Sequence, residues 1–181
     1  TANTAGTIAG ALLTGFFLIP WLGAQTAMVV GAAGNAALGV AVLLASAPAQ
    51  LARRLTLIIP IVLLFTAGTG FLPRWDQRFM AGGVSIYAQR FLSEADPSGS
   101  FREEVASRQL LFYREGINST VAVERSERNT SLKIDGKVDA STSVDLCTQL
   151  LTGHLPMLLR PRAETALVIG LGSGMTCSAV V

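Results

Sequence analysis

Charge is missing from the first part of the chain: the first 52 residues contain no Asp, Glu, Lys, Arg or His. A hydrocarbon core is crossed by about 20 apolar residues, so a charge-free run of this length excludes an ordinary soluble N-terminal domain and predicts membrane-embedded helices. Every charged residue follows Ala52, so averages over the whole chain describe neither part of it.

Cysteine and histidine are also scarce. The two cysteines, Cys147 and Cys177, and the single histidine, His154, are too few and too scattered for a disulfide framework or a metal site. We expect two buried thiols in a reducing compartment and a structural role for His154. The net charge of +2 arises from interleaved acids and bases, which excludes a nucleic-acid-binding surface.

Proline and glycine divide the charge-free run. Pro20 and Gly23 interrupt helical continuity, and Trp21 between them suits the interface of lipid and water. We therefore expect a first helix over about residues 5–19 and a second over about residues 24–46. A signal peptide is the alternative for the first helix, although no basic segment precedes it.

A third span is expected over residues 55–73, with Pro60 tolerated as a kink. Pro48, Arg53 and Arg54 should form the loop that precedes it. Residues 1–73 are thus predicted to be a membrane domain of three helices in contact with lipid.

Small residues recur every four positions along the second helix, at Ala27, Gly31, Asn35 and Gly39. Such a stripe lets another helix approach closely, either in this chain or in a homo-oligomer. Asn35 would lie within the membrane, where it can bond to a neighbouring helix or mark a transport path; we favour packing.

The arginines favour a cytoplasmic polar region. Two follow the second span, and three follow the third, Arg74, Arg78 and Arg90. Two glycosylation-like triplets, at Asn118 and Asn129, would matter only in a lumen, and both fall in expected hairpin turns. We therefore expect a multi-pass protein of the inner (plasma) membrane.

The polar part begins with a juxtamembrane connector, residues 74–107, in which residues 94–100 are expected to be a loop. A small antiparallel β domain should follow over residues 108–141, because short β-branched or aromatic segments alternate with turn residues. A tight turn is expected at Asp135 and Gly136. The four strands are expected at residues 109–114, 120–124, 131–134 and 137–140.

A helix should come next. Thr142 or Ser143 can cap its N-terminus, Asp145 lies near its positive end, and the helix should end near Thr152 with Gly153 closing it.

Three glycines at alternate positions, Gly170, Gly172 and Gly174, follow an apolar run that we expect to be a buried parallel strand over residues 166–169. Glycine accepts positive φ and has no Cβ, so such a loop can lie against a nucleotide-like ligand. The G-x-G-x-G spacing differs from the dinucleotide fingerprint and favours an S-adenosylmethionine-type ligand. A structural turn without ligand is the alternative.

The expected fold class is therefore a multispanning α-helical membrane segment, a small antiparallel β domain and the start of a Rossmann-like α/β domain over residues 142–181. The chain starts at Thr1 and stops at Val181, soon after the glycine loop, so we expect it to be a truncated piece of a longer protein that is inactive by itself.

Five short sequence motifs carry a family resemblance by their order and spacing between residues 111 and 174: L-F-Y-R-E-G, T-V-A-V-E, I-D-G, G-H-L-P and V-I-G-L-G-S-G. The chain resembles the spermidine synthase (polyamine aminopropyltransferase) family, and in particular its membrane-fused bacterial branch. The resemblance implies transfer of an aminopropyl group from decarboxylated S-adenosylmethionine, as co-substrate, to an amine or polyamine acceptor such as putrescine. Methylthioadenosine would be released, and no cofactor is implied.

The resemblance also implies site residues. Ligand contacts would come from the glycine loop, with Ser173 in place of the family's Asp, and from Gln149. Asp139 takes the place of a family glutamine, and Thr148 the place of a tyrosine. The family's catalytic Asp would lie beyond Val181, so no catalytic residue is assigned and none is expected to hold a metal.

Two other functions stay open. The helices could form a transporter or sensor whose nucleotide-binding domain is not catalytic, or the glycine loop could serve an S-adenosylmethionine-dependent methyltransferase. Glu115 and Asp135, which could be mistaken for a carboxylate pair, are interpreted as turn or surface residues.

Overall fold

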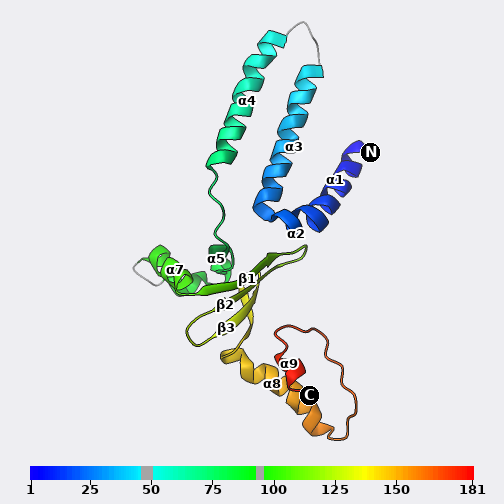
Figure 1. The fold of residues 1–181 in the computed structure, drawn as a ribbon, viewed down its shortest axis with the longest axis vertical. Helices are drawn as coiled ribbons and strands as arrows, with labels where there is room; N and C mark the ends of the chain where they lie inside the picture. Colours follow the sequence, from blue (N-terminus) through cyan, green and yellow to red (C-terminus); the bar gives the residue numbers. More distant parts are fainter. Residues whose placement is uncertain (46–50, 93–95) are drawn as a thin grey trace. The chain divides into compact units, whose positions relative to one another are not determined.

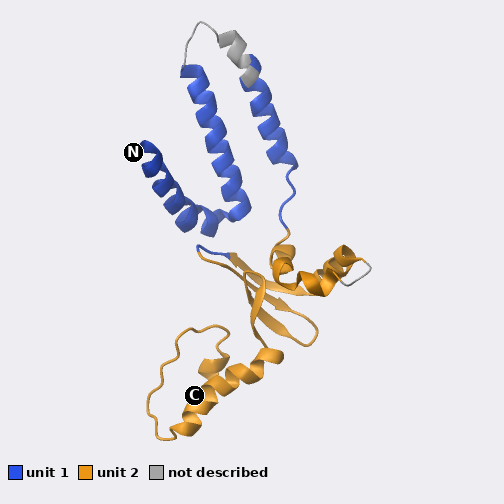
Figure 2. Cartoon of the chain, turned by 180° about the vertical axis from the view of Figure 1, so that it is seen from behind, with its two compact units in different colours: residues 1–75, 115–117 blue, residues 76–114, 118–181 orange. Residues whose placement is uncertain are grey.

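The computed structural model describes residues 1–45, 51–92 and 96–181, with the backbone alone for residues 51–55 and 57. The chain forms two compact units, coloured separately in Figure 2. Unit 1 comprises Thr1–Trp75 with Glu115–Ile117, and unit 2 comprises Asp76–Arg114 with Asn118–Val181.

Unit 1 opens with a continuous helical run built from α1 (Ala2–Leu13), the π-helical η1 (Thr14–Leu18) and α2 (Ile19–Leu22). Pro20 does not end this run, contrary to the sequence prediction. The preceding turn is widened, and the N–H of Ile19 bonds to the carbonyl of Thr14, five residues back. A π turn relieves the clash of a proline ring with the preceding turn. The run ends instead at Gly23, where φ is +81°.

The second and third helices, α3 (Ala24–Ala45) and α4 (Leu51–Phe71), pack side by side (Figure 1). Gln25, at the start of α3, donates to the carbonyl of Pro73 at 2.8 Å and accepts from the N–H of Trp75 at 3.0 Å. This side chain holds the start of α3 against the segment that follows α4.

Two helical runs, Ala2–Leu22 and Ala24–Ala45, are long and apolar enough to cross a membrane. Their large apolar side chains are mostly uncovered; Leu38 is 64% exposed. Of the small-residue stripe, Ala27 is buried, whereas Gly31, Asn35 and Gly39 are exposed.

The predicted loop before the third span is partly wrong. Arg53 and Arg54 belong to the backbone of α4, which is helical from Leu51 and continues through Pro60. Pro48, and the predicted end of the second helix at Ser46, lie outside the described residues.

Unit 2 contains the predicted four-stranded antiparallel sheet, in the order β1-β2-β3-β4. The strands are β1 (Gln109–Glu115), β2 (Thr120–Arg125), β3 (Thr130–Ile134) and β4 (Lys137–Ser141). Asp135 and Gly136 both have positive φ, as a tight two-residue hairpin turn requires, and the Asp135 carboxylate accepts from the N–H of Thr120 at 2.7 Å.

Three short helices, α5 (Gln77–Met80), α6 (Val84–Leu92) and α7 (Pro97–Ala106), precede the sheet. The predicted loop at residues 94–100 is wrong from Pro97 onward, because Asp96 caps α7 by accepting from the N–H of Gly99 at 3.0 Å, with Pro97 in the first turn. Glu94 and Ala95 lie outside the described residues.

The helices cover one face of the sheet. Lys133 on β3 donates to the carbonyl of Ala81 at 3.2 Å, and the N–H of Val138 on β4 donates to the hydroxyl of Tyr87 at 3.1 Å. The β3–β4 register is irregular between Leu132 and Lys133. Lys133 pairs with Val138 on the helix-covered face, whereas Leu132 pairs with Ala140 on the other face.

After the sheet, α8 (Val144–Leu159) runs well past the predicted end at Thr152 and through Pro156. Ser143 is its N-cap residue but makes no side-chain cap bond; the hydroxyl of Ser141 accepts from the N–H of Asp145 at 3.1 Å instead. Gly153 therefore does not close the helix. It lies where α9 (Met175–Ser178) packs, and an added Cβ would be 2.5 Å from the Cβ of Ala179.

The predicted parallel strand at residues 166–169 is not formed. This segment is irregular, and Leu167 and Ile169 are 85% and 91% exposed. A parallel strand needs a hydrogen-bonded neighbour, and within the described residues the only sheet is the antiparallel one. The predicted start of a Rossmann-like domain is therefore not formed by these residues.

Candidate ligand-binding site

The glycine loop has the backbone geometry that its sequence predicts. The φ values of Gly170, Gly172 and Gly174 are +90°, +53° and +79°. The N–H of Gly174 bonds to the carbonyl of Leu171 at 2.8 Å, and Gly174 is the N-cap residue of α9. No atom lies within 4 Å of a Cβ built on any of the three glycines, so open space borders the loop.

Three predicted site residues, distant in sequence, are joined by hydrogen bonds. The hydroxyl of Ser173 donates to Oε1 of Gln149 at 2.7 Å, and Nε2 of Gln149 donates to the backbone carbonyl of Asp139 at 3.4 Å. Thr176 adds a second bond, from its hydroxyl to the carbonyl of Gln149 at 3.1 Å. The loop is thereby fastened to α8, and α8 to the edge strand β4.

A pocket of about 320 Å³ lies between the glycine loop and the sheet. Its sheet wall combines the apolar side chains of Val123, Leu132 and Ala140 with three hydroxyl-bearing residues. These are Thr130, Ser141 and Thr142, and Gly172 and Ser173 form part of the loop wall. Of the six predicted ligand-binding residues, only Gly172 and Ser173 line it. Gly170 and Gly174 flank them in the loop. Gln149 and Asp139 do not line the pocket, but Gln149 bonds to Ser173 and to the backbone carbonyl of Asp139.

The exposed carboxylate of Asp139 accepts from Nζ of Lys137 at 2.9 Å. This hydrogen bond, together with the attraction between the two charges, raises the pKa of Lys137 above its usual value. The backbone carbonyl of the same Asp139 accepts the bond from Gln149 that helps to fasten the loop.

Other candidate residues take no part in the pocket. His154 and Cys147 are exposed on α8, and Cys177 is partly buried in α9, so the expectation of two buried thiols is not met. Glu115 belongs to unit 1, where its carboxylate accepts from the N–H of Ala24. In the described parts of the chain, no group of three or more His, Cys, Asp or Glu side chains could hold a metal ion.

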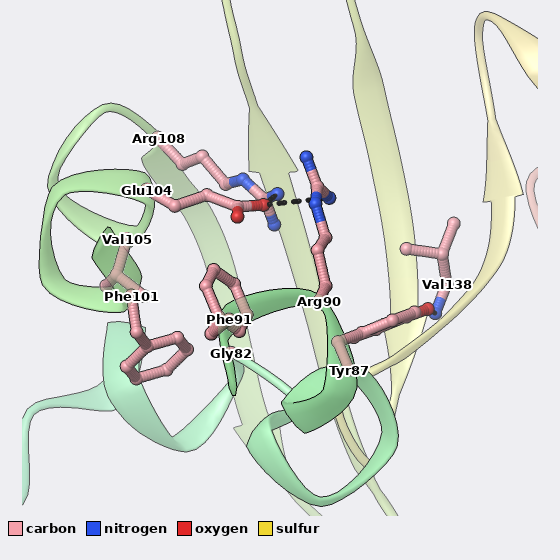
Figure 3. Close-up of a pocket in the computed structure, with 9 residues that line it drawn as sticks. All are labelled: Gly82, Tyr87, Arg90, Phe91, Phe101, Glu104, Val105, Arg108 and Val138. Carbon is pink, nitrogen blue, oxygen red and sulfur yellow. Dashed lines mark hydrogen bonds and ion pairs between the residues drawn. The ribbon is translucent and has the colours of Figure 1, made fainter. Parts of the chain in front are cut away.

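Sequence reasoning missed a buried network of charges on the helix-covered face of the sheet. Nζ of Lys133, a residue only 1% exposed, lies 2.7 Å from Oε2 of Glu124, and the same oxygen lies 3.3 Å from Nη1 of Arg108. Arg108 also pairs with Oε1 of Glu104, which Nη1 of Arg90 approaches to 3.4 Å (Figure 3). The five residues come from α6, α7, β2, β3 and the segment before β1. The one local signal was polar alternation in β2 and β3.

No family model, curated protein or solved structure matches the chain.

Proposed function

We propose that the chain is the membrane-anchored part of an aminopropyltransferase-like enzyme and that the pocket beside the glycine loop binds the adenosyl co-substrate. The observation that carries the proposal is the joining of Ser173 to Gln149 beside a pocket that Gly172 lines. The spermidine synthase resemblance implies contacts with decarboxylated S-adenosylmethionine at these positions, with Ser173 in place of the family's Asp.

The pocket suits such a ligand chemically. Val123, Leu132 and Ala140 offer an apolar wall for a flat adenine ring, while the loop offers glycine backbone that a ribose can approach closely. In the transfer, the acceptor nitrogen forms a bond to the methylene next to the sulfonium. The C–S bond breaks, the thioether leaves with the electron pair, and the amine loses one proton. Because the sulfonium is already a good leaving group, alignment of the two substrates supplies most of the catalysis.

We also propose that α4 is a third span, which makes the protein multi-pass. Within α4, the stretch Ile58–Phe71 carries no charge, and its two polar side chains, Thr66 and Thr69, donate to carbonyls of the same helix. The arginine distribution favours placing unit 2 in the cytoplasm, where adenosyl compounds are available.

Binding calorimetry on the full chain in detergent micelles tests the proposal and constitutes our first prediction. Gly172→Val should abolish binding of decarboxylated S-adenosylmethionine and methylthioadenosine, because a β-branched residue at φ +53° is strained and its side chain enters the pocket. Gly170→Val is the matched control: it introduces the same strain at φ +90°, but Gly170 does not line the pocket, so some affinity should survive.

Ser173→Ala should cost about 1 kcal/mol of binding free energy, because it removes the bond that fastens the loop to Gln149. Wild-type affinity in Gly172→Val would reject the site. Preference for S-adenosylmethionine over its decarboxylated form would favour a methyltransferase.

A transporter or sensor with a non-catalytic ligand domain is the second candidate. It is favoured by the hydroxyl of Ser173 standing where the resembled family has a carboxylate. Tight binding of methylthioadenosine or the adenosyl donors, without effect of putrescine on that affinity, would support it.

A further inference from the structure

The sheet wall of the pocket beside the glycine loop has a regular layout. Val123 on β2 pairs with Leu132 on β3, and Leu132 pairs with Ala140 on β4, so the three apolar side chains form a row on one face of the sheet. Side chains two residues apart along a strand share a face, so Thr130 and Thr142 continue this face beyond the row. The N–H of Thr142 donates to the carbonyl of Thr130 at 3.0 Å, and both residues line the pocket.

The hydroxyl of Thr142 can act toward a ligand only as an acceptor. It donates its proton to Oδ1 of Asn129 at 3.2 Å and accepts from the N–H of Thr130 at 2.9 Å. Because a hydroxyl oxygen has one proton and two lone pairs, one lone pair of Thr142 is left over. Thr142 is exposed and lines the pocket, so this lone pair is available to a hydrogen-bond donor on a ligand.

The other two hydroxyl groups of the sheet wall do not oppose this preference. The hydroxyl of Ser141 donates to the carboxylate of Asp145 at 2.6 Å and accepts from the N–H of the same residue at 3.1 Å. The hydroxyl of Thr130 makes no hydrogen bond to another described residue, so it can rotate either to donate or to accept. Among the described side chains, the sheet wall thus has a fixed acceptor at Thr142 and no fixed donor that faces it.

We propose that Thr142 is a specificity-determining residue, which makes this pocket select a ring that carries an amino group over the same ring without one. The inference rests on the proposed function, in which an adenine ring lies against Val123, Leu132 and Ala140. Thr142 follows Ala140 on the same face, so its oxygen can accept from the exocyclic amino group at the edge of that ring. A ring without the amino group leaves the acceptor unpaired, and a keto group in its place sets a second acceptor against it.

Calorimetry with three uncharged nucleosides tests the proposal: methylthioadenosine, its analogue without the amino group, and its analogue with a keto group in place of the amino group. Each is titrated into the full chain in non-ionic micelles, with protein-free micelles as the blank. Methylthioadenosine should bind about tenfold more tightly than either analogue, as expected for one hydrogen bond. Equal affinities of the three nucleosides would overturn the inference and leave the proposed function standing, whereas no binding of any of them would overturn both.

Variants assign the preference to one oxygen atom. Thr142→Val keeps the shape of the side chain but removes the oxygen, so the three nucleosides should bind within about twofold of one another. Thr142→Ser keeps the oxygen and should keep the wild-type preference.

Thr152→Val is the matched control. It also removes an exposed threonine hydroxyl with an internal bond, here to the carbonyl of Thr148 at 2.8 Å, but Thr152 does not line the pocket. This variant should therefore discriminate among the nucleosides as the wild type does, and circular dichroism verifies that each variant is folded. If Thr142→Val discriminates like Thr152→Val, the role assigned to Thr142 is wrong.

Discussion

Lys133 is a fully buried lysine in unit 2, and burying its charged side chain is energetically costly. A lysine that is 1% exposed must have its charge matched, and Glu124 and the carbonyl of Ala81 together accept from its ammonium group. Glu124 in turn has Arg108 as a second partner. The two buried charges, Lys133 and Glu124, thus have partners of opposite charge, which explains how a polar face of the sheet can be the buried one.

Our second prediction is that removing one member of this charged network lowers the stability of unit 2. Lys133→Met leaves the Glu124 carboxylate with one cation instead of two and should lower local stability by about 3–5 kcal/mol. Lys133→Met combined with Glu124→Gln removes the orphaned charge and should recover part of the loss. Hydrogen exchange of the β2 and β3 amides measures both. Equal destabilisation in the single and double variants would contradict the role given to charge.

Gly153 carries the third prediction. Alanine normally favours a helix over glycine by about 1 kcal/mol. Here an added Cβ would meet the Cβ of Ala179 at 2.5 Å and the carbonyl of Thr176 at 2.7 Å, and overpacking costs about 1–3 kcal/mol. Gly153→Ala should therefore expose the α9 amides to faster hydrogen exchange. Gly34→Ala on α3, where no atom lies within 4 Å, is the matched control and should leave exchange unchanged or slower.

Among the elements, the hairpins were predictable and the helices before them were not. Turn residues and alternating β-branched positions are local signals, so all four strands and the Asp135–Gly136 turn appear near their expected places. Asp96 followed by Pro97 is a helix-start signal, but the serines and the glycine that follow favoured a loop, so the start of α7 was missed. Alternation in T-V-A-V-E could not tell which face is buried, because that depends on α6 and α7, distant in sequence.

The candidate site divides in the same way. Positive φ at three glycines follows from their spacing and from the short helix behind them. The Ser173–Gln149 bond joins residues 24 positions apart and depends on the path of the segment between α8 and α9, which no local pattern specifies. The buried strand at residues 166–169 was predicted from apolar composition, but composition cannot provide the neighbouring strand that such a segment needs.

The N-cap of α7 gives the fourth prediction, a pH dependence. The N–H of Gly99 and the hydroxyl of Ser98 bond to the Asp96 carboxylate and hold its pKa below the usual 3.8. A lowered folded-state pKa means that the cap stabilises the fold above the ordinary aspartate pKa and loses this effect as pH falls through the lower, folded value. Asp96→Ala should therefore melt below the wild type at pH 7, and the difference should shrink below about pH 4. A difference independent of pH would exclude the ionised cap.

At the scale of the whole molecule, the chain combines two apolar helical runs in unit 1 with a polar unit 2 that contains the pocket beside the glycine loop. Our fifth prediction is that the chain is recovered with membranes and that unit 2 faces the cytoplasm. In a Cys177→Ser background, the exposed Cys147 should react with an impermeant maleimide only after cells are permeabilised. Labelling in intact cells would place unit 2 outside the cytoplasm, where adenosyl compounds are not available to it, and would contradict the proposed function.

Two glycines in back-to-back contact have a consequence for the order of folding. The Cβ that Gly136 lacks would lie 2.5 Å from the Cα of Gly83, so the β3–β4 turn and the turn before α6 touch through bare backbone. The hairpin closes over a few residues and should form within microseconds, whereas the Gly83 contact closes a loop of more than 50 residues. We therefore expect the hairpin to form early and to serve as the template on which α6 docks. A side chain at Gly136 would slow refolding by delaying this docking step.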